Sequence, residues 1–191
     1  MSVEIVEKKK AYAGWLSMWV ASIRLADGRF MRREIVEHGQ AVCVLPYDAL
    51  RRTTVLVRQL RVPVYVTAGE ERLLEAIAGM VDDGDPSATV RREALEEAGL
   101  RLGDLESVAD AWPSPGFLTE RVALYLAPYR LQDRVGAGGG LAEEHEEIEV
   151  VEMPLENVAA MADRGELVDL KTLCLVQTLR LRHPRLFGTQ P

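Results

Sequence analysis

Cysteine, histidine and long apolar runs are all scarce in this sequence. Its 191 residues include two cysteines and three histidines, which are too few for a disulfide framework and are not spaced as a zinc site. Its longest apolar runs, such as residues 41–45 and 173–176, are far shorter than the roughly 18 residues that span a bilayer. The sequence therefore excludes a disulfide scaffold and a transmembrane helix, and it predicts that Cys43 and Cys174 are free thiols among aliphatic neighbours.

An excess of positive charge is also lacking. Lysine and arginine number 23 against 30 aspartates and glutamates, which gives a net charge of -7. A nucleic-acid-binding protein needs a basic face that displaces counterions from phosphates, so we expect no nucleic-acid partner. The first residues lack the apolar core and cleavage site of a secretory signal, and we therefore expect a cytoplasmic protein with no membrane partner.

The composition, with 48% hydrophobic and 28% charged residues, is that of one ordinary globular domain with room for a small appended module. Residues 15–25 and 29–36 alternate around the turn 26–28 and predict an N-terminal β-hairpin. Further strands are expected at residues 40–45, 53–58, 73–78, 105–111, 122–127 and from 147 to 152, with 46–48 as a turn, and helices at 155–163 and 170–181. This mixed order predicts an α/β sandwich with helices over a mixed sheet.

One further helix has clear end signals. The segment 85–87 supplies a capping aspartate and a proline in the first turn, and Gly99 follows the last helical residue, so a helix is expected to run to residue 98. Its small or apolar positions Ala88, Leu95 and Ala98 are expected to pack on the sheet. The acidic positions would then point into a cleft.

Three glutamates of this helix carry the candidate chemistry. Glu93, Glu96 and Glu97 lie three or four residues apart, so their carboxylates project from one side. Like charges at that spacing repel, and a hard divalent cation among them removes the repulsion, which favours Mg²⁺ or Mn²⁺ over zinc. Arg92 lies four residues before Glu96 and is placed to orient its carboxylate. The alternative is a solvent-exposed acidic face, as on many charged helices.

The segment 92–100, Arg-Glu-Ala-Leu-Glu-Glu-Ala-Gly-Leu, resembles the signature of the Nudix hydrolase family. Gly79 and the loop 80–85 resemble the start of the same signature, although the span from Gly79 to Arg92 is one residue shorter than the general pattern and Asp85 replaces the usual glutamate. The shorter span resembles the nucleotide-sugar pyrophosphatase branch of the family. Similarity to that branch continues at residues 58–61, 74–75, 114–116, 119–120, 137–150, 165–166 and 171–172.

The resemblance implies a Nudix-type α/β/α sandwich with a mixed sheet over residues 39–191, preceded by an N-terminal β-hairpin module over residues 1–38. It implies Mg²⁺-dependent hydrolysis, with Mn²⁺ also suitable, of the diphosphate in GDP-mannose or ADP-ribose to a nucleoside monophosphate and a sugar 1-phosphate. Two alternatives are a Nudix domain kept for ligand binding or regulation and a housecleaning nucleoside triphosphate pyrophosphatase. The complete set of glutamates argues against the first, and the similarity outside the signature argues against the second.

The resemblance also implies roles for individual residues. The implied metal ligands are Glu93, Glu97, Glu146 and the carbonyl of Ala78, and the implied catalytic residues are Glu144 as base, Glu96 as a further ligand or close neighbour, and Arg92. The acidic segment 143–147 is crowded, so a shift of one residue would exchange the roles of its glutamates, and alone it would be a solvated loop. Glycines 138–140 before it would make either a mobile loop that closes over substrate or a flexible linker.

Arg58, Arg61, Ser114, Gly116 and Glu120 resemble the substrate-binding positions of the family. Guanidinium forks suit a diphosphate, although arginines at strand ends are often simply exposed, and the segment 114–116 is also a good turn.

The N-terminal module of similar proteins often packs across a twofold partner, so the resemblance implies a homodimer. Trp15 and Trp19, four residues apart on an expected strand, would share one face and fill such an interface. They would otherwise cover the core of their own chain.

Overall fold

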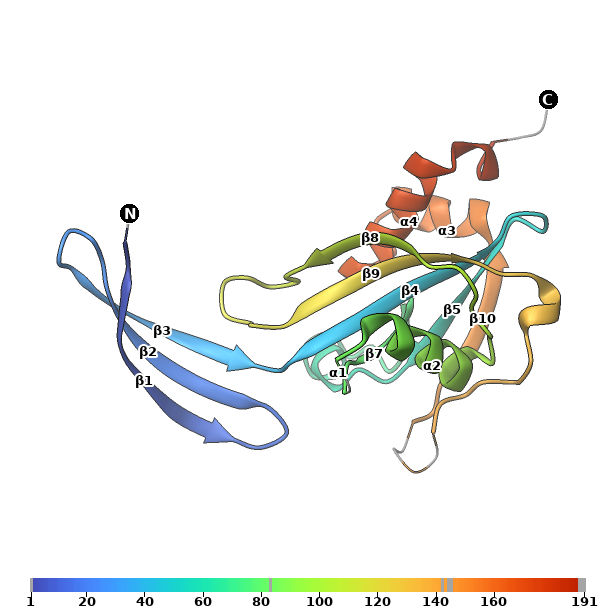
Figure 1. Cartoon of the computed structure of the whole chain (residues 1–191). Coiled ribbons are helices and arrows are strands. Elements are labelled where there is room, and N and C mark those ends of the chain that lie inside the picture. Colours follow the sequence, from blue (N-terminus) through green and yellow to red (C-terminus); the bar gives the residue numbers. More distant parts are fainter. Residues whose placement is uncertain (1, 83, 142, 144–145, 189–191) are drawn as a thin grey trace. The chain divides into compact units, whose positions relative to one another are not determined.

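Figure 1 presents the chain as a computed structural model, which describes residues 2–82, 84–141, 143 and 146–188. The chain divides into two compact units, the first made of residues 1–40 and 111–122 and the second of residues 41–110 and 123–191. In the described part of the chain, no helix has both the length and the hydrophobicity needed to cross a lipid bilayer.

The first unit contains a three-stranded antiparallel sheet in the order β1-β2-β3, formed by β1 (Glu4–Ala13), β2 (Ser17–Arg24) and β3 (Phe30–Glu37). The predicted hairpin is confirmed as β2 and β3, and Gly28 adopts a φ of 84° in its turn. Strand β1 was not predicted from the sequence. Every one of its residues is exposed. Its central lysines interrupt the alternation of apolar and polar residues by which a half-buried strand is predicted.

Trp15 and Trp19 do not share a strand, so the prediction that they lie on one face of a common strand is wrong. Trp15 lies in the turn between β1 and β2, is 84% exposed, and places its ring 4.2 Å from the ring of His38. Trp19 lies in β2, where its indole N–H donates to Glu37 at 2.8 Å and the Lys8 ammonium sits 4.1 Å over its ring. Residue spacing alone does not reveal that the strand begins at Ser17, after Trp15.

The remaining elements build a sheet flanked by helices. They are β4 (Gln40–Asp48), β5 (Thr53–Gln59), α1 (Val62–Ala68), β6 (Leu73–Glu75), β7 (Ile77–Met80), α2 (Pro86–Ala98), β8 (Glu106–Ala111), β9 (Arg121–Pro128), β10 (Glu149–Pro154), α3 (Leu155–Asp163) and α4 (Leu170–Arg182), with 3-10 turns at Leu131–Asp133 and Pro184–Leu186. The strand order is β10-β5-β4-β9-β8, with β6 paired to β5 and β7 paired to β4.

Helices cover both faces of this sheet, with α2 on one side and α3 and α4 on the other (Figure 1). The alternation of β4 explains the two layers, because Val42 and Val44 join the core beneath α2 while Cys43 and Leu45 are buried toward the opposite face. Strand β4 runs antiparallel to β5 and in the same direction as β9 (Figure 1). The predicted α/β sandwich with a mixed sheet is confirmed.

Two expected boundaries in the sheet differ from the structure. Residues 46–48 were expected to form a turn, but they continue β4, and Tyr47 and Asp48 pair with β5. Residues 73–78 were expected to form one strand, but the chain breaks at Ala76, so that β6 pairs with β5 and β7 pairs with β4. These two short strands fill a split where β4 and β5 diverge.

Helix α2 has the predicted ends. The Asp85 carboxylate accepts from the Ser87 backbone N–H at 2.9 Å, and Gly99 ends the helix with a φ of 65°. The buried face differs from the expected one. Of the expected positions, Ala98 is buried, whereas Ala88 is exposed and Leu95 is 46% exposed. Val90 and Ala94 complete the buried face with Ala98. Glu97 lies on this buried face, and its carboxylate is therefore drawn into the interface between helix and sheet.

Candidate functional site

The predicted metal ligands come from three segments of the second unit. Helix α2 supplies Glu93 and Glu97, β7 supplies Ala78, and the segment before β10 supplies Glu146. Glu97 is only 2% exposed, and its carboxylate accepts from the Ala78 backbone N–H at 3.4 Å. The Glu93 carboxyl lies over Gly79 in the space that a β-carbon at residue 79 would occupy. A glycine at residue 79 is therefore required for Glu93 to approach β7.

Negative charge accumulates around Glu97. Burial, together with repulsion from Glu93 and Glu146, raises the pKa of Glu97 to about 8, against smaller opposing effects of the Ala78 N–H and Arg61. A buried group with this environment needs either a proton or a nearby cation. Oxygen ligands of this kind suit a hard divalent ion such as Mg²⁺ or Mn²⁺.

The carboxylates do not form a closed cage in the structure. Within residues 2–82, 84–141, 143 and 146–188, no three metal-ligating side chains stand together as a preformed cluster. Glu97 nevertheless interacts electrostatically with both Glu93 and Glu146. The chemistry of the donors fits a divalent cation, and the individual ligand assignments stay predictions.

Arg92 holds the outer carboxylates of the helix. Its guanidinium lies 2.8 Å from the Glu96 carboxylate, 2.6 Å from Glu93 and 3.6 Å from Asp82. The contact with Glu96 is the one expected from their spacing. Because Arg92 also contacts Glu93, it offsets part of the repulsion within the acidic face.

The glycine tract 138–140 packs against the end of α2. The N–H of Gly139 donates to the Glu97 carbonyl at 2.9 Å, and that of Gly140 donates to the Glu96 carbonyl at 3.2 Å. The tract also accepts from the Ile148 N–H through Gly139, and the Glu146 carboxylate accepts from the Leu141 N–H. The glycines therefore cap the carbonyls that α2 leaves free and bring Glu146 toward Glu97. Glu144, the predicted base, lies outside the described residues.

The five predicted substrate-binding residues are divided between the two units. Arg58 and Arg61 belong to the second unit, whereas Ser114, Gly116 and Glu120 belong to the first. Arg58 lies 3.0 Å from Glu149 on β10. In the first unit, the Glu120 carboxylate contacts the His38 ring at 2.9 Å. The structure brings Arg61 close enough to Glu97 for an electrostatic interaction. That the five residues bind one substrate together stays a prediction.

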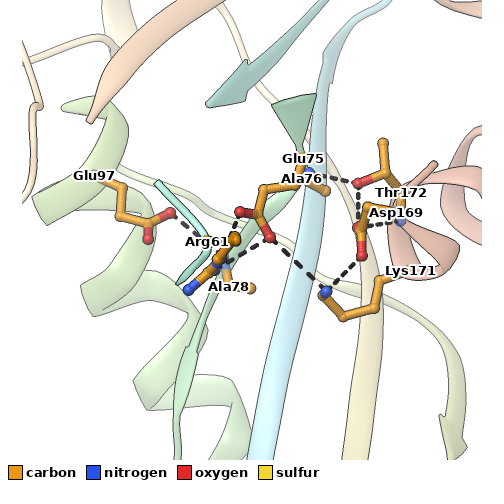
Figure 2. A network of polar contacts seen from close by, with 8 residues as sticks. All are labelled: Arg61, Glu75, Ala76, Ala78, Glu97, Asp169, Lys171 and Thr172. Atoms are coloured by element: carbon orange, nitrogen blue, oxygen red, sulfur yellow. Dashed lines mark hydrogen bonds and ion pairs between the residues drawn. The ribbon is translucent and has the colours of Figure 1, made fainter. Parts of the chain in front are cut away.

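Sequence reasoning from residue types alone missed a polar network beside this site (Figure 2). It joins Arg61, Glu75, Ala76, Asp169, Lys171 and Thr172. Glu75 is 1% exposed, and its carboxylate forms ion pairs with both Arg61 and Lys171. The available signal was a single glutamate inside the apolar segment 73–77, where an unpaired charge would be costly.

Comparison with known proteins identifies the family. The NUDIX domain matches residues 37–175. GDP-mannose pyrophosphatase of Pectobacterium atrosepticum is 38% identical over 185 residues, which cover 94% of this chain and 95% of that protein. The GDP-mannose pyrophosphatases of Salmonella arizonae and Escherichia coli O157:H7 are each 37% identical over 160 residues, which cover 82% of this chain and 83% of theirs.

A solved structure supports the fold. The crystal structure of an ADP compounds hydrolase superposes with a TM-score of 0.79, covering 97% of this chain and 96% of that chain at 16% identity. The α/β sandwich of this chain is thus also the fold of that ADP compounds hydrolase. The chain belongs to the Nudix hydrolase family, whose members generally depend on a divalent metal.

We expect Glu97→Gln to stabilise the metal-free protein in a pH-dependent way. Between the ordinary carboxyl pKa and about 8, unfolded Glu97 is ionised while native Glu97 holds a proton, so rising pH destabilises the wild type. The advantage of the variant should grow by up to about 1.4 kcal/mol per pH unit across that window. Urea unfolding in EDTA at several pH values measures it, with the exposed Glu71→Gln as control. An advantage that is constant from pH 5 to 8 would contradict the charge burial.

We expect Gly138→Ala to destabilise the protein by roughly 1 kcal/mol or more. Gly138 has a φ of 72°, and a β-carbon there would collide with the backbone of Glu97 and Ala98. The matched control is Gly103→Ala, because a β-carbon at Gly103 meets no atom within 4 Å. Urea unfolding of both variants tests the packing of the tract on α2, and equal stabilities would show that the tract does not pack there.

Proposed function

We propose that this chain hydrolyses the diphosphate of a nucleoside diphosphate sugar, with a GDP-sugar such as GDP-mannose preferred over ADP-ribose. The observation that carries the proposal is the extent of similarity to the GDP-mannose pyrophosphatase of Pectobacterium atrosepticum, which spans 94% of the chain. The buried Glu97 beside two other carboxylates supports a metal-dependent reaction. The products would be a nucleoside monophosphate and a sugar 1-phosphate.

We assign Mg²⁺ as the metal, with Mn²⁺ as a substitute, held by Glu93, Glu97, Glu146 and the Ala78 carbonyl. When bound, the ion would neutralise charge on the diphosphate oxygens and favour attack by water. Glu96, held by Arg92, completes the acidic face as a further ligand or a neighbour. Glu144 is assigned as the base that takes the proton from the attacking water.

Arg61 is the best-supported substrate ligand among the described residues. Its Nε and Nη2 donate to the Glu75 carboxylate at 2.7 and 3.1 Å, which fixes the plane of the guanidinium. The side chain is 40% exposed, and its contact with Glu75 uses Nε and Nη2 but not Nη1. Arg61 is thus anchored on one edge and can donate to a phosphate with the other. Arg58, Ser114, Gly116 and Glu120 are assigned to the same substrate.

We further assign residues 1–38 as an N-terminal module that forms a cytoplasmic homodimer and residues 39–191 as the hydrolase domain. Support comes from β1, which exposes the apolar side chains of Ile5, Val6 and Tyr12. Burial of these side chains between two chains would remove apolar surface from water. Light scattering of the full chain should give the mass of a dimer, and a monomer mass would contradict the assignment.

A parallel hydrolysis assay tests the activity directly. With Mg²⁺, GDP-mannose should yield GMP and mannose 1-phosphate faster than ADP-ribose yields its products, and GTP should release little pyrophosphate. Glu97→Gln should lose turnover by orders of magnitude while circular dichroism shows an intact fold, because the ion loses a buried ligand.

The other outcomes separate the alternatives. Pyrophosphate release from GTP without cleavage of GDP-mannose would identify a nucleoside triphosphate pyrophosphatase. Binding of GDP-mannose without any cleavage would identify a ligand-binding module. Near-normal turnover by Glu97→Gln would refute its role as a metal ligand.

A further inference from the structure

The segment that leads to Glu120 is paired with the end of β3 inside the first unit. The Val36 N–H donates to the Phe117 carbonyl at 2.8 Å, and Val36 forms a parallel bridge with Leu118. In a parallel pairing both strands advance in the same direction, and residues two positions further along point to the same face. His38 and Glu120, each two residues beyond the bridge, therefore come side by side.

The side chains of His38 and Glu120 meet at this position. Nδ1 of His38 lies 2.9 Å from Oε2 of Glu120, and the two side chains are only 15% and 17% exposed. An ionised carboxylate only accepts hydrogen bonds, so the imidazole donates through its Nδ1–H. Because both partners are largely withdrawn from water, this hydrogen bond is stronger than one between exposed side chains.

Trp15 restrains the imidazole of His38. Its indole approaches the His38 ring edge-on, with the ring centroids 4.2 Å apart and the planes at 67°. Aromatic pairs favour this arrangement, which limits rotation of the imidazole and keeps Nδ1 directed at Glu120. The contact with His38 uses Oε2 of the carboxylate and not Oε1. Oε1 is therefore the oxygen that can accept from a hydroxyl or N–H group of a ligand.

The pair of side chains is not needed to hold the 117–119 segment on β3. Backbone hydrogen bonds already do so, because Val36 donates to the Phe117 carbonyl and accepts from the Thr119 N–H at 2.9 Å. The backbone does not fix the side chain of Glu120, which has several rotatable bonds. Affinity falls when such a side chain becomes ordered only on binding, whereas a side chain that is already held avoids this loss.

We propose that His38 is a positioning residue for substrate binding, which holds the Glu120 carboxylate before the ligand arrives so that Oε1 accepts from a hydroxyl or N–H group of the nucleotide sugar. This inference rests on the proposed function, because that function assigns Glu120 to the substrate. It adds to the substrate-binding residues a histidine that lies outside the acidic signature.

The test compares His38→Leu, which removes the hydrogen-bond donor, with His38→Asn, whose amide N–H can replace the Nδ1–H. The KM for GDP-mannose should rise roughly fivefold in His38→Leu and stay within about twofold of the wild type in His38→Asn, with kcat nearly unchanged in both. The affinity for GDP-mannose, measured by calorimetry in EDTA to prevent turnover, should fall in parallel with the rise in KM.

His183→Leu is the matched control. His183 makes the same kind of contact with a glutamate, since its Nε2 lies 3.0 Å from Glu106, and both residues belong to the second unit. The control should leave the KM and the affinity for GDP-mannose unchanged. If His38→Leu lowers the melting temperature but leaves KM and affinity unchanged, the contact with Glu120 is structural only and the proposal is wrong.

A double-mutant cycle tests whether His38 acts through Glu120. In a Glu120→Ala background, His38→Leu should change the affinity for GDP-mannose by less than about twofold, because the carboxylate that His38 positions is absent. Equal losses in both backgrounds would overturn the proposal. If the double variant does not fold, the single variants decide, since Glu120→Ala must then lose at least as much affinity as His38→Leu, and a smaller loss would also overturn it.

The wild type separates this inference from the proposed function. If the wild type binds GDP-mannose without cleaving any nucleotide sugar, the proposed function fails, and the affinities in EDTA still decide the role of His38. If the wild type cleaves GDP-mannose and His38→Leu binds it and turns it over equally well, the positioning role fails while the function stands. If the wild type neither binds nor cleaves nucleotide sugars, both fail.

Discussion

The burial of one carboxylate, that of Glu97, is the constraint on which the rest of the site depends. A carboxylate that is 2% exposed and repelled by Glu93 and Glu146 holds a proton up to about pH 8 unless a cation replaces it. Such a group lowers the stability of the empty fold at neutral pH. In the function proposed above, the same charge concentration would attract a divalent ion, and the ion would in turn attract a diphosphate. Stability and activity therefore make opposite demands on this residue.

Much of the surrounding backbone serves to hold this carboxylate in place. The glycine tract caps the carbonyls at the end of α2, Gly79 leaves room for Glu93, and the Ala78 N–H is the hydrogen-bond donor to Glu97. The split between β4 and β5 adds a connection through the sheet, so that the start of α4 is bonded to the strand that carries Ala78. Residues far from the acidic signature in the sequence thereby contribute to its geometry.

The sequence alone predicted those elements whose ends are set by local chemistry. Helix α2 was placed correctly because Asp85 and Gly99 mark its ends, and α3, α4 and most strands followed from apolar spacing. The fold class and the family also followed from these patterns and the resemblance. Local residue patterns could not predict strand β1, the break at Ala76 or the network around Glu75, because each is decided by pairing partners distant in sequence. The buried face of α2 was misplaced for the same reason, since the sheet selects Val90 and Ala94 rather than Leu95.

Metal binding by the buried carboxylate is tested most directly by titrating the metal-free protein with Mn²⁺ near pH 7 and following free Mn²⁺ by electron paramagnetic resonance. The wild type should bind Mn²⁺ saturably, and calorimetry in two buffers should detect proton release, because the ion displaces the proton held by Glu97. Glu97→Gln should bind at least about tenfold more weakly and release fewer protons. Equal affinity and equal proton release in the two proteins would contradict the assignment of Glu97 as the ligand around which the site is built.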